Sequence, residues 1–239
     1  MSPNLWSRSR RVLVTGGTGV LGREVVRAFV SAGGDVHVTW TDPQEAERFE
    51  QDRAEEPFSR VTLHRVDLAD AEQVASLGAT LERAGGVDVL AGLAGAFAYG
   101  AIGETPPAVW TGMWAANASS AFFAARAVVP GMQARRWGRI VLVSSVAALG
   151  QDAGNKSAYT AAKSAVLGLV SSLSAELVGD EITVNAVLPT VMDTPANRRD
   201  MPDADRSRWL PPAEVAGVIA FLASDAARIV TGSSLVLAR

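Results

Sequence analysis

The feature that most constrains the fold is a regular alternation of short apolar runs with amphipathic stretches of about 12 to 20 residues. The apolar runs are rich in Val, Leu and Ile and are mostly continuous, as expected for strands buried on both faces of a parallel sheet. The pattern therefore predicts repeated β-α units. The predicted strands are 11–15, 36–40, 61–66, 87–91, 139–144, 182–188 and 233–237. The predicted helices are 20–32, 44–55, 71–84, 107–136 (broken), 157–178 and 212–223.

Length and composition agree with one large buried core. The chain has 239 residues, 48% of them hydrophobic and 20% charged, and no linker or repeat interrupts the alternation. We expect a single α/β domain over residues 1–239, a doubly wound parallel sheet of seven strands with helices on both faces, and treat two domains as the alternative.

Charge and residue usage exclude several classes of protein. A net charge of −3 argues against a nucleic-acid partner. The chain has no cysteine and two histidines, so neither a disulfide framework nor a Cys/His metal site is expected, and redox chemistry must come from a cofactor. His37 and His64 have no partner at a useful spacing and are assigned to structure. Lacking a signal peptide or an apolar run long enough for a membrane helix, the chain is expected to be soluble, cytoplasmic and independent of membranes.

A glycine-rich turn follows the first predicted strand. In TGGTGVLG, glycines Gly16, Gly19 and Gly22 precede a helix pattern that begins at Val20. Glycines in this place allow a tight turn and a close backbone approach to a pyrophosphate, which the helix N-terminus attracts. The motif predicts a Rossmann-type dinucleotide site rather than a plain turn, and Thr18 and Leu21 are expected to bind the cofactor with these glycines.

A second signal is Tyr159 followed four residues later by Lys163, on one face of a predicted helix. An ammonium stabilises a phenolate, so the pair can exchange a proton with a substrate oxygen. Ser144 and Ser145 end the fifth predicted strand, where a hydroxyl could hydrogen-bond a carbonyl oxygen, although a capping serine is the simpler interpretation of either alone. Asn117 lies in a helix pattern that its low helix propensity should interrupt.

Residues 190–210 fit neither pattern and predict a loop or lid with short helical turns at most. Residues on the expected substrate side are Ala96, Phe97, Leu149, Met192 and Trp209, although core packing explains each one equally well. Met113, Trp114, Phe122 and Phe123 recur at helical spacing and predict a packing or subunit-contact face.

Together these motifs resemble the short-chain dehydrogenases/reductases over essentially the whole chain, from Arg11 to Leu237. The resemblance implies that Tyr159 is the catalytic acid/base, and that Lys163 lowers its pKa and holds the nicotinamide ribose. It implies that Ser145 orients the substrate and that Asn117 supports a proton relay. The cofactor contacts that it implies are Asp67 and Leu68 at the adenine, Ala94 and Gly95 after the fourth strand, and Pro189, Val191 and Thr194 at the nicotinamide and diphosphate.

Four departures limit the resemblance. Val20 replaces a usual glycine, and Gly92-Leu93 replaces an asparagine pair, which removes a strand-stabilising side chain. The loop from Ser145 to Tyr159 is one residue longer than is common, which leaves Ser144 as a substitute, and Thr190 replaces a glycine. The region 187–209 is locally most similar to the dihydropteridine reductase branch and its bacterial relatives, but that branch lacks the serine.

The residues at the end of the second predicted strand do not decide whether the cofactor is NAD(H) or NADP(H). An acidic side chain there would bind the ribose 2′-OH of NAD, and an arginine would accept the 2′-phosphate of NADP. Trp40 holds the position and does neither, whereas Asp42 could reach the ribose or cap the next helix.

The sequence thus predicts an NAD(P)(H)-dependent oxidoreductase that transfers hydride between nicotinamide and a carbonyl or alcohol carbon of a small, apolar molecule. The alternatives are a quinonoid dihydropteridine-type reductase and a non-catalytic dinucleotide sensor. A sugar-nucleotide epimerase fits less well, because the stretch after Leu188 is short. The resemblance also implies a homodimer or homotetramer, with the helices at 107–136 and 157–178 in an interface.

Overall fold

The computed structural model describes residues 5–53 and 61–239, and in these ranges seven parallel strands form one sheet. Its order is β3-β2-β1-β4-β5-β6-β7, so the predicted α/β class is confirmed. The strands lie within about two residues of their expected positions. They are β1 (Arg11–Thr15), β2 (Asp35–Trp40), β3 (Val61–Arg65), β4 (Val89–Gly92), β5 (Gly138–Val143), β6 (Ile182–Pro189) and β7 (Ser234–Leu237).

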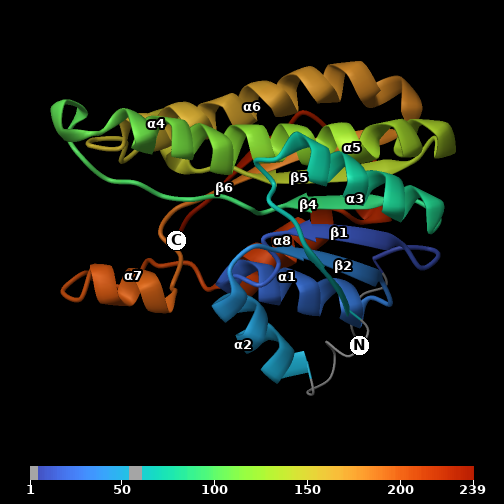
Figure 1. The fold of residues 1–239 in the computed structure, drawn as a ribbon, viewed down its shortest axis with the longest axis horizontal. Helices are drawn as coiled ribbons and strands as arrows, with labels where there is room; N and C mark the ends of the chain where they lie inside the picture. The colour runs from blue at the N-terminus through green and yellow to red at the C-terminus, as the bar shows by residue number, and fades with distance from the viewer. Residues whose placement is uncertain (1–4, 54–60) are drawn as a thin grey trace.

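Helices cover both faces of the sheet (Figure 1). On one face, α1 (Val20–Ser31) packs against α8 (Pro212–Leu222), with α2 (Pro43–Arg53) beside them. The other face carries α3 (Ala71–Arg83), α5 (Ser120–Arg135) and α6 (Ser157–Leu177). Helix α4 (Pro107–Met113) precedes α5, and α7 (Pro195–Asp200) lies apart from both layers. The expected end of the second helix, at 54–55, lies outside the described residues.

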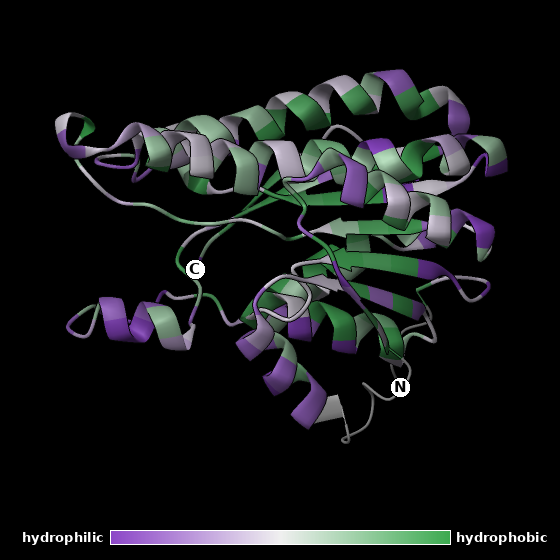
Figure 2. Ribbon diagram, viewed as in Figure 1, coloured by the Kyte–Doolittle hydropathy of each residue, from purple (hydrophilic) through white to green (hydrophobic). Residues whose placement is uncertain are grey.

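Two apolar clusters hold these layers together. Leu13, Leu90 and Ile140 point from the sheet toward α3 and α5, whereas Val14 and Val38 point toward α1 and α8. Figure 2 shows the strands as the most continuously hydrophobic part of the chain. Since both faces of the sheet are covered at its centre, β1, β4, β5 and β6 are almost fully buried, which explains their largely apolar sequences, whereas the edge strands β3 and β7 are partly exposed.

The connections that follow β1 and β4 determine where the functional edge of the sheet lies. The chain leaves β1 toward α1 on one face and leaves β4 toward α4 and α5 on the other, although β1 and β4 are neighbours in the sheet. This reversal opens a crevice beyond the carboxyl ends of the two strands, which is where ligands bind in doubly wound sheets.

The interruption expected in the helix pattern at 107–136 is present. Helix α4 ends at Met113, the six residues Trp114–Ser119 are π-helical, and α5 begins at Ser120. Such π-helical turns shift side chains out of the regular α-helical register and are frequent at functional sites.

The histidines are structural, but the expectation that they lack a partner is wrong. Nδ1 of His37 and Nε2 of His64 lie 2.9 Å apart, and the rings stack with centroids 5.2 Å apart. The pairing of β2 with β3 brings together residues far apart in the sequence. Burial lowers the pKa of both rings, which favours a neutral pair sharing one hydrogen bond.

Helix α6 belongs to the layer on the sheet. The segment Ser157–Asp180 is long and apolar enough to cross a membrane by length and composition alone, as the core helix of a soluble protein can also be. It packs against β6 and β5 and carries the buried Lys163, so its apolar length is explained by the fold.

Candidate active site

Because the strands are parallel, their carboxyl ends meet at one edge of the sheet, and most of the expected site residues follow those ends. The loop after β1 carries the glycine-rich turn, and the loop after β4 carries Ala94 and Gly95. Ser144 and Ser145 follow β5, and Val191 and Thr194 follow β6. The fold therefore brings the expected nucleotide and catalytic residues to one crevice.

The glycine-rich turn needs glycine for two different reasons. Gly16 has a φ of +65°, and a Cβ there would lie 3.0 Å from Ala94 Cα. A Cβ on Gly22 would overlap the carbonyl oxygen of Gly16 and Cα of Gly17, so any side chain would push α1 away from the strand. Gly19 precedes α1 without a side-chain cap, which leaves first-turn amides for an anionic group.

The support expected to be lost after β4 comes from β1. Oγ1 of Thr15 accepts hydrogen bonds from the amides of Leu93 and Ala94, at 3.1 and 3.3 Å. Thr15 is 2% exposed, so its hydroxyl is an internal tie between two neighbouring strands. The sequence alone does not single out this threonine, because a strand-terminal Thr has no distinctive spacing.

Ser145 and Tyr159 come together despite the 14-residue separation in sequence. The side chain of Ser145 lies close enough to the Tyr159 hydroxyl to act against the rise in its pKa, and its Oγ accepts from the amide of Ala147 at 3.2 Å. The ring of Phe97 meets the Tyr159 ring edge-on, with centroids 5.0 Å apart. Two hydroxyls and an apolar wall thus share one place at the sheet edge.

Lys163 and Asn117 meet above Gly95. A Cβ on Gly95 would lie 2.6 Å from Oδ1 of Asn117 and 3.1 Å from Nζ of Lys163. Nζ donates to the carbonyl oxygen of Val143 at 2.9 Å, whereas Nδ2 of Asn117 donates to two carbonyl oxygens, those of Ala96 and Met113. Oδ1 of Asn117 is buried with no hydrogen-bond partner among the described residues. An acceptor is thus left without a donor beside a buried ammonium.

The two adjacent serines differ in what they can do. Oγ of Ser144 is buried and donates to the carbonyl oxygen of Lys163 at 2.8 Å, which ties α6 to the end of β5. Ser145 points to Tyr159 instead. The geometry therefore favours Ser145 over Ser144 as the hydroxyl available to a substrate.

Burial sets the protonation of the pair on α6. It lowers the pKa of Lys163 to about 8 and raises the pKa of Tyr159, against the smaller opposite effect of the Ser145 hydrogen bond. Nζ of Lys163 lies 5.9 Å from the centre of the Tyr159 ring. The expected lowering of the Tyr159 pKa is therefore not present in this structure.

The adenosine end has fewer ready contacts. Oδ1 of Asp42 accepts from the amide of Gln44 at 2.8 Å, so its capping role is the one observed. The guanidinium carbon of Arg65 lies over the Trp40 ring, 5.7 Å from the centroid of that ring. Asp67, followed by the buried Leu68, is exposed and accepts from the amide of Ala69.

In the segment 190–210, expected to be a loop or lid, the two ends are hydrogen-bonded to each other. Met192 and Leu210 form an isolated parallel bridge, and α7 projects from it with no buried side chain (Figure 1). Oγ1 of Thr194 caps α7 by accepting from the amide of Asn197 at 3.2 Å. Trp209 is buried, so core packing is the better interpretation of that residue.

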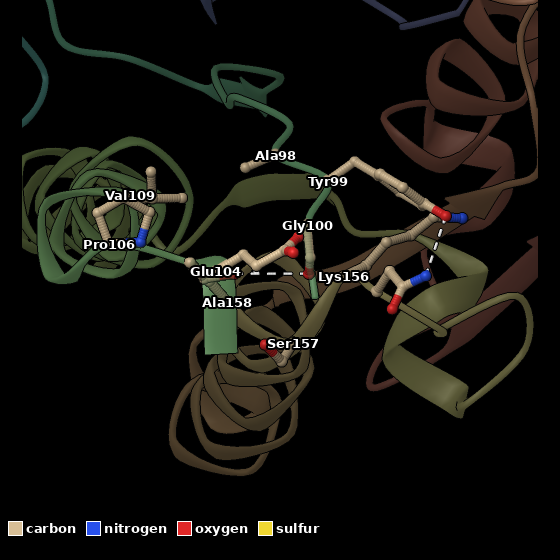
Figure 3. Close-up of a pocket in the computed structure, with 11 residues that line it drawn as sticks. Ala98, Tyr99, Gly100, Glu104, Pro106, Val109, Lys156, Ser157 and Ala158 are labelled. Carbon is tan, nitrogen blue, oxygen red and sulfur yellow. Dashed lines mark hydrogen bonds between the residues drawn. The ribbon is translucent and has the colours of Figure 1, made fainter. Parts of the chain in front are cut away.

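A shallow pocket lies beside the start of α6, just before Tyr159 (Figure 3). Nδ2 of Asn155 donates to the Tyr99 hydroxyl at 3.0 Å, and the Gly100 amide donates to the Asn155 carbonyl at 2.8 Å. Asn155 has a left-handed backbone, with φ at +56°. These bonds fasten the loop after β4 to the loop preceding Tyr159, a link that the sequence pattern did not reveal.

These features fit a nicotinamide dinucleotide. The glycine-rich turn packs closely against Ala94 and the first turn of α1, and this helix offers uncapped amides to a pyrophosphate. The unpartnered Oδ1 of Asn117 and the ammonium of Lys163 lie together at the catalytic end. Within the described ranges, no group of three or more metal-ligating side chains is present.

Comparison with known proteins agrees with this geometry. Residues 18–238 match a family model described as Enoyl-(Acyl carrier protein) reductase. The chain is 30% identical to D-beta-hydroxybutyrate dehydrogenase of Cupriavidus necator, over 94% of each chain. It is 33% identical to 2-(R)-hydroxypropyl-CoM dehydrogenase of Xanthobacter autotrophicus, over 96% of this chain and 97% of that one.

A solved structure titled short chain dehydrogenase/reductase family protein superposes with a TM-score of 0.87 at 31% identity, covering 98% of this chain and 97% of that chain. The two sequence relatives are dehydrogenases of hydroxylated molecules rather than dihydropteridine reductases, so the local similarity at 187–209 does not extend to a branch assignment. Sequence, fold and site agree at the level of the family. The chain belongs to the short-chain dehydrogenase/reductase family of NAD(P)-dependent oxidoreductases.

Proposed function

We propose that the chain interconverts a carbonyl and an alcohol on a small, apolar molecule, with Asn117, Ser145, Tyr159 and Lys163 as its catalytic residues. The observation that carries this is the meeting of the Ser145 and Tyr159 side chains next to the glycine-rich crevice. When bound, NAD(H) or NADP(H) supplies or accepts the hydride.

The chain's own groups orient the substrate and move the proton. Ser145 donates a hydrogen bond to the substrate oxygen and holds it near Tyr159. The Tyr159 hydroxyl gives its proton to that oxygen during reduction and takes it back during oxidation. Since its pKa is raised, Tyr159 is protonated at neutral pH in this structure, which suits the reducing direction.

Lys163 and Asn117 support this exchange. With a pKa of about 8, Lys163 is mostly protonated at neutral pH and close to its titration point. Its ammonium and Oδ1 of Asn117 flank Gly95, where a water or a ribose hydroxyl would complete the hydrogen bonds that Oδ1 lacks. This is the arrangement that a proton relay to Tyr159 needs.

The substrate class follows from the walls of the site. Phe97 is 60% exposed and touches Tyr159, and Leu149 is 49% exposed at the end of the turn after Ser145. The other lysine of the chain, Lys156, is engaged by the carboxylate of Asp152 at 2.5 Å. The named relatives act on hydroxylated molecules, which agrees with a secondary alcohol or ketone as the reacting group.

Assembly and location form part of the same proposal. We place a homodimer or homotetramer interface on α4, α5 and α6, since Trp110 on α4, Phe122 on α5 and Val178 directly after α6 are exposed. The acidic net charge and the lack of cysteine support a cytoplasmic protein with a small-molecule partner.

The test is the absorbance of NADH and NADPH during incubation with ketones, diketones, quinones and quinonoid dihydropterin. Tyr159→Phe should lower kcat by at least about a hundredfold, the low end of general acid/base effects, without weakening dinucleotide binding. Tyr99→Phe is the matched control, because it removes the hydroxyl of the other tyrosine in the chain and should cost far less.

The outcomes separate the alternatives. Near-normal turnover in Tyr159→Phe removes this residue from the mechanism. Preference for quinonoid dihydropterin supports the dihydropteridine-type reductase. Dinucleotide binding without turnover on any substrate of the panel favours the sensor.

A further inference from the structure

A carboxylate lies against the glycine-rich turn from outside it. Oγ1 of Thr18 donates to Oε2 of Glu45 at 3.1 Å. Thr18 is 4% exposed and lies between Gly16 and Gly19, and Glu45 belongs to the first turn of α2. The contact therefore joins the loop after β1 to the helix after β2.

The region after β2 is where folds of this type bind the adenosine ribose of a dinucleotide. In this type of fold, a side chain following β2 distinguishes a ribose 2′-hydroxyl from a 2′-phosphate. Trp40, the last residue of β2, offers no carboxylate, and Asp42 caps α2 through the amide of Gln44. Glu45 is the carboxylate that reaches back to the turn.

We propose that Glu45 binds the adenosine ribose and makes the enzyme prefer NAD(H) over NADP(H). In this structure the hydroxyl of Thr18 donates to the Glu45 carboxylate, and a ribose hydroxyl would donate to the same carboxylate. A 2′-hydroxyl gains a charge-assisted hydrogen bond there, whereas a 2′-phosphate meets a like charge and has no proton to donate at neutral pH. The assignment rests on the proposed function, since it concerns the same dinucleotide.

Nearby cations do not reverse this preference. Arg23 and Arg48 repel one another. The carboxylates of Glu24 and Glu45 attract the charge of Arg23. Arg65 lies over the Trp40 ring. A 2′-phosphate that took the place of the Thr18 hydroxyl at Glu45 would bring two negative charges together, and the repulsion of like charges grows as their distance shrinks.

The test is direct binding, measured by isothermal titration of the purified protein with NADH and with NADPH and no substrate. The wild type should bind NADH at least about tenfold more tightly, on the order of one charge-assisted hydrogen bond. Glu45→Gln should raise the Kd for NADH about tenfold and leave the Kd for NADPH unchanged or lower. Glu45→Asp retains the charge but shortens its reach, so its Kd for NADH should lie between those of the wild type and Glu45→Gln.

Glu47→Gln is the matched control, because it removes the same charge from an exposed position on α2 and should leave both Kd values unchanged. Circular dichroism and melting temperature confirm that each variant is folded. Wild-type protein that binds NADPH as tightly as NADH overturns the proposal. So does a preference that survives Glu45→Gln but falls in Asp42→Asn. Failure to bind either dinucleotide refutes the proposed function as well.

Discussion

The buried polar centre at Asn117 and Lys163, proposed above as catalytic, and the loops around it differ in which side chains they expose. At the centre, Asn117 and Lys163 are 1% and 5% exposed, and each is hydrogen-bonded to backbone carbonyl groups. Around it, Phe97, Leu149 and Ile102 are 60%, 49% and 77% exposed. Polar groups are thus enclosed and apolar groups exposed, the reverse of ordinary folding.

The difference shows what each region is for. A buried polar group costs stability unless its partners are fixed, so the centre holds its reacting groups in one arrangement. Exposed apolar side chains gain stability only when something covers them, which a substrate or a second subunit can do. Changes at the enclosed polar groups Asn117 and Lys163 should therefore alter stability as well as turnover, whereas changes in the loops should alter binding and motion.

The largest expected effect is at Lys163. Lys163→Met should abolish most turnover, by at least about a hundredfold, and yet stabilise the protein. Burial holds the lysine pKa near 8 against 10.5 in the unfolded chain, so folding with the charge costs on the order of 3 kcal/mol below pH 8. The free energy of unfolding, from urea titration at pH 7, should rise by up to this amount.

The pH dependence of the free energy of unfolding tests whether the buried charge of Lys163 destabilises the folded state. A lowered lysine pKa means that the folded state binds fewer protons than the unfolded state between pH 8 and 10.5, so wild-type stability should rise with pH in that window. The advantage of Lys163→Met should therefore be constant below pH 8 and shrink above it. An advantage independent of pH up to 9.5 would show that burial of the charge is not its cause.

A second prediction separates the adjacent serines. Ser145→Ala should lower kcat by about a hundredfold with little change in melting temperature, because its hydroxyl faces Tyr159. Ser144→Ala should lower stability by about 1 to 2 kcal/mol and reduce turnover less, because its hydroxyl ties α6 to β5.

Steady-state kinetics and urea unfolding of both variants, side by side, measure the contrast. If Ser144→Ala loses more turnover than Ser145→Ala at equal stability, the substrate-orienting role moves to Ser144. The longer loop before Tyr159 would then have changed which serine faces the substrate.

Much of the fold could be predicted from the sequence because each strand is a local apolar run with a local stop signal. Gly16 and Gly22 likewise announce a turn whose geometry excludes side chains. The interruption of the helix at Asn117 could be predicted too, since an asparagine is poorly suited to a helix interior.

What escaped prediction depends on pairs that are distant in sequence. The ties of Thr15 to Leu93 and of Thr18 to Glu45 arise only when the strand order is known. The raised pKa of Tyr159 likewise depends on burial, which the Tyr-Lys spacing does not encode. Sequence spacing proposes the reacting groups but does not show which contacts surround them.

The smallest expected effects are in the lid. Helix α7 buries no side chain, whereas the amides of Asp193 and Leu210 are hydrogen-bonded at the base. Without ligand, amides at 195–200 should exchange quickly with solvent, and NADH should slow them several-fold while leaving the base unchanged. Hydrogen exchange with mass spectrometry measures both segments in one experiment.

Arg198→Ala sharpens this last prediction. Arg198 forms two hydrogen bonds with the carboxylate of Asp193, at 2.6 and 2.7 Å, on an exposed surface. Because exposed ion pairs contribute little, the variant should change KM by less than about fivefold and leave kcat nearly intact, while speeding exchange at 195–200. A large loss of kcat would instead place the pair in the catalytic centre, and the lid would then belong to the enclosed, hydrogen-bonded region rather than to the loops around it.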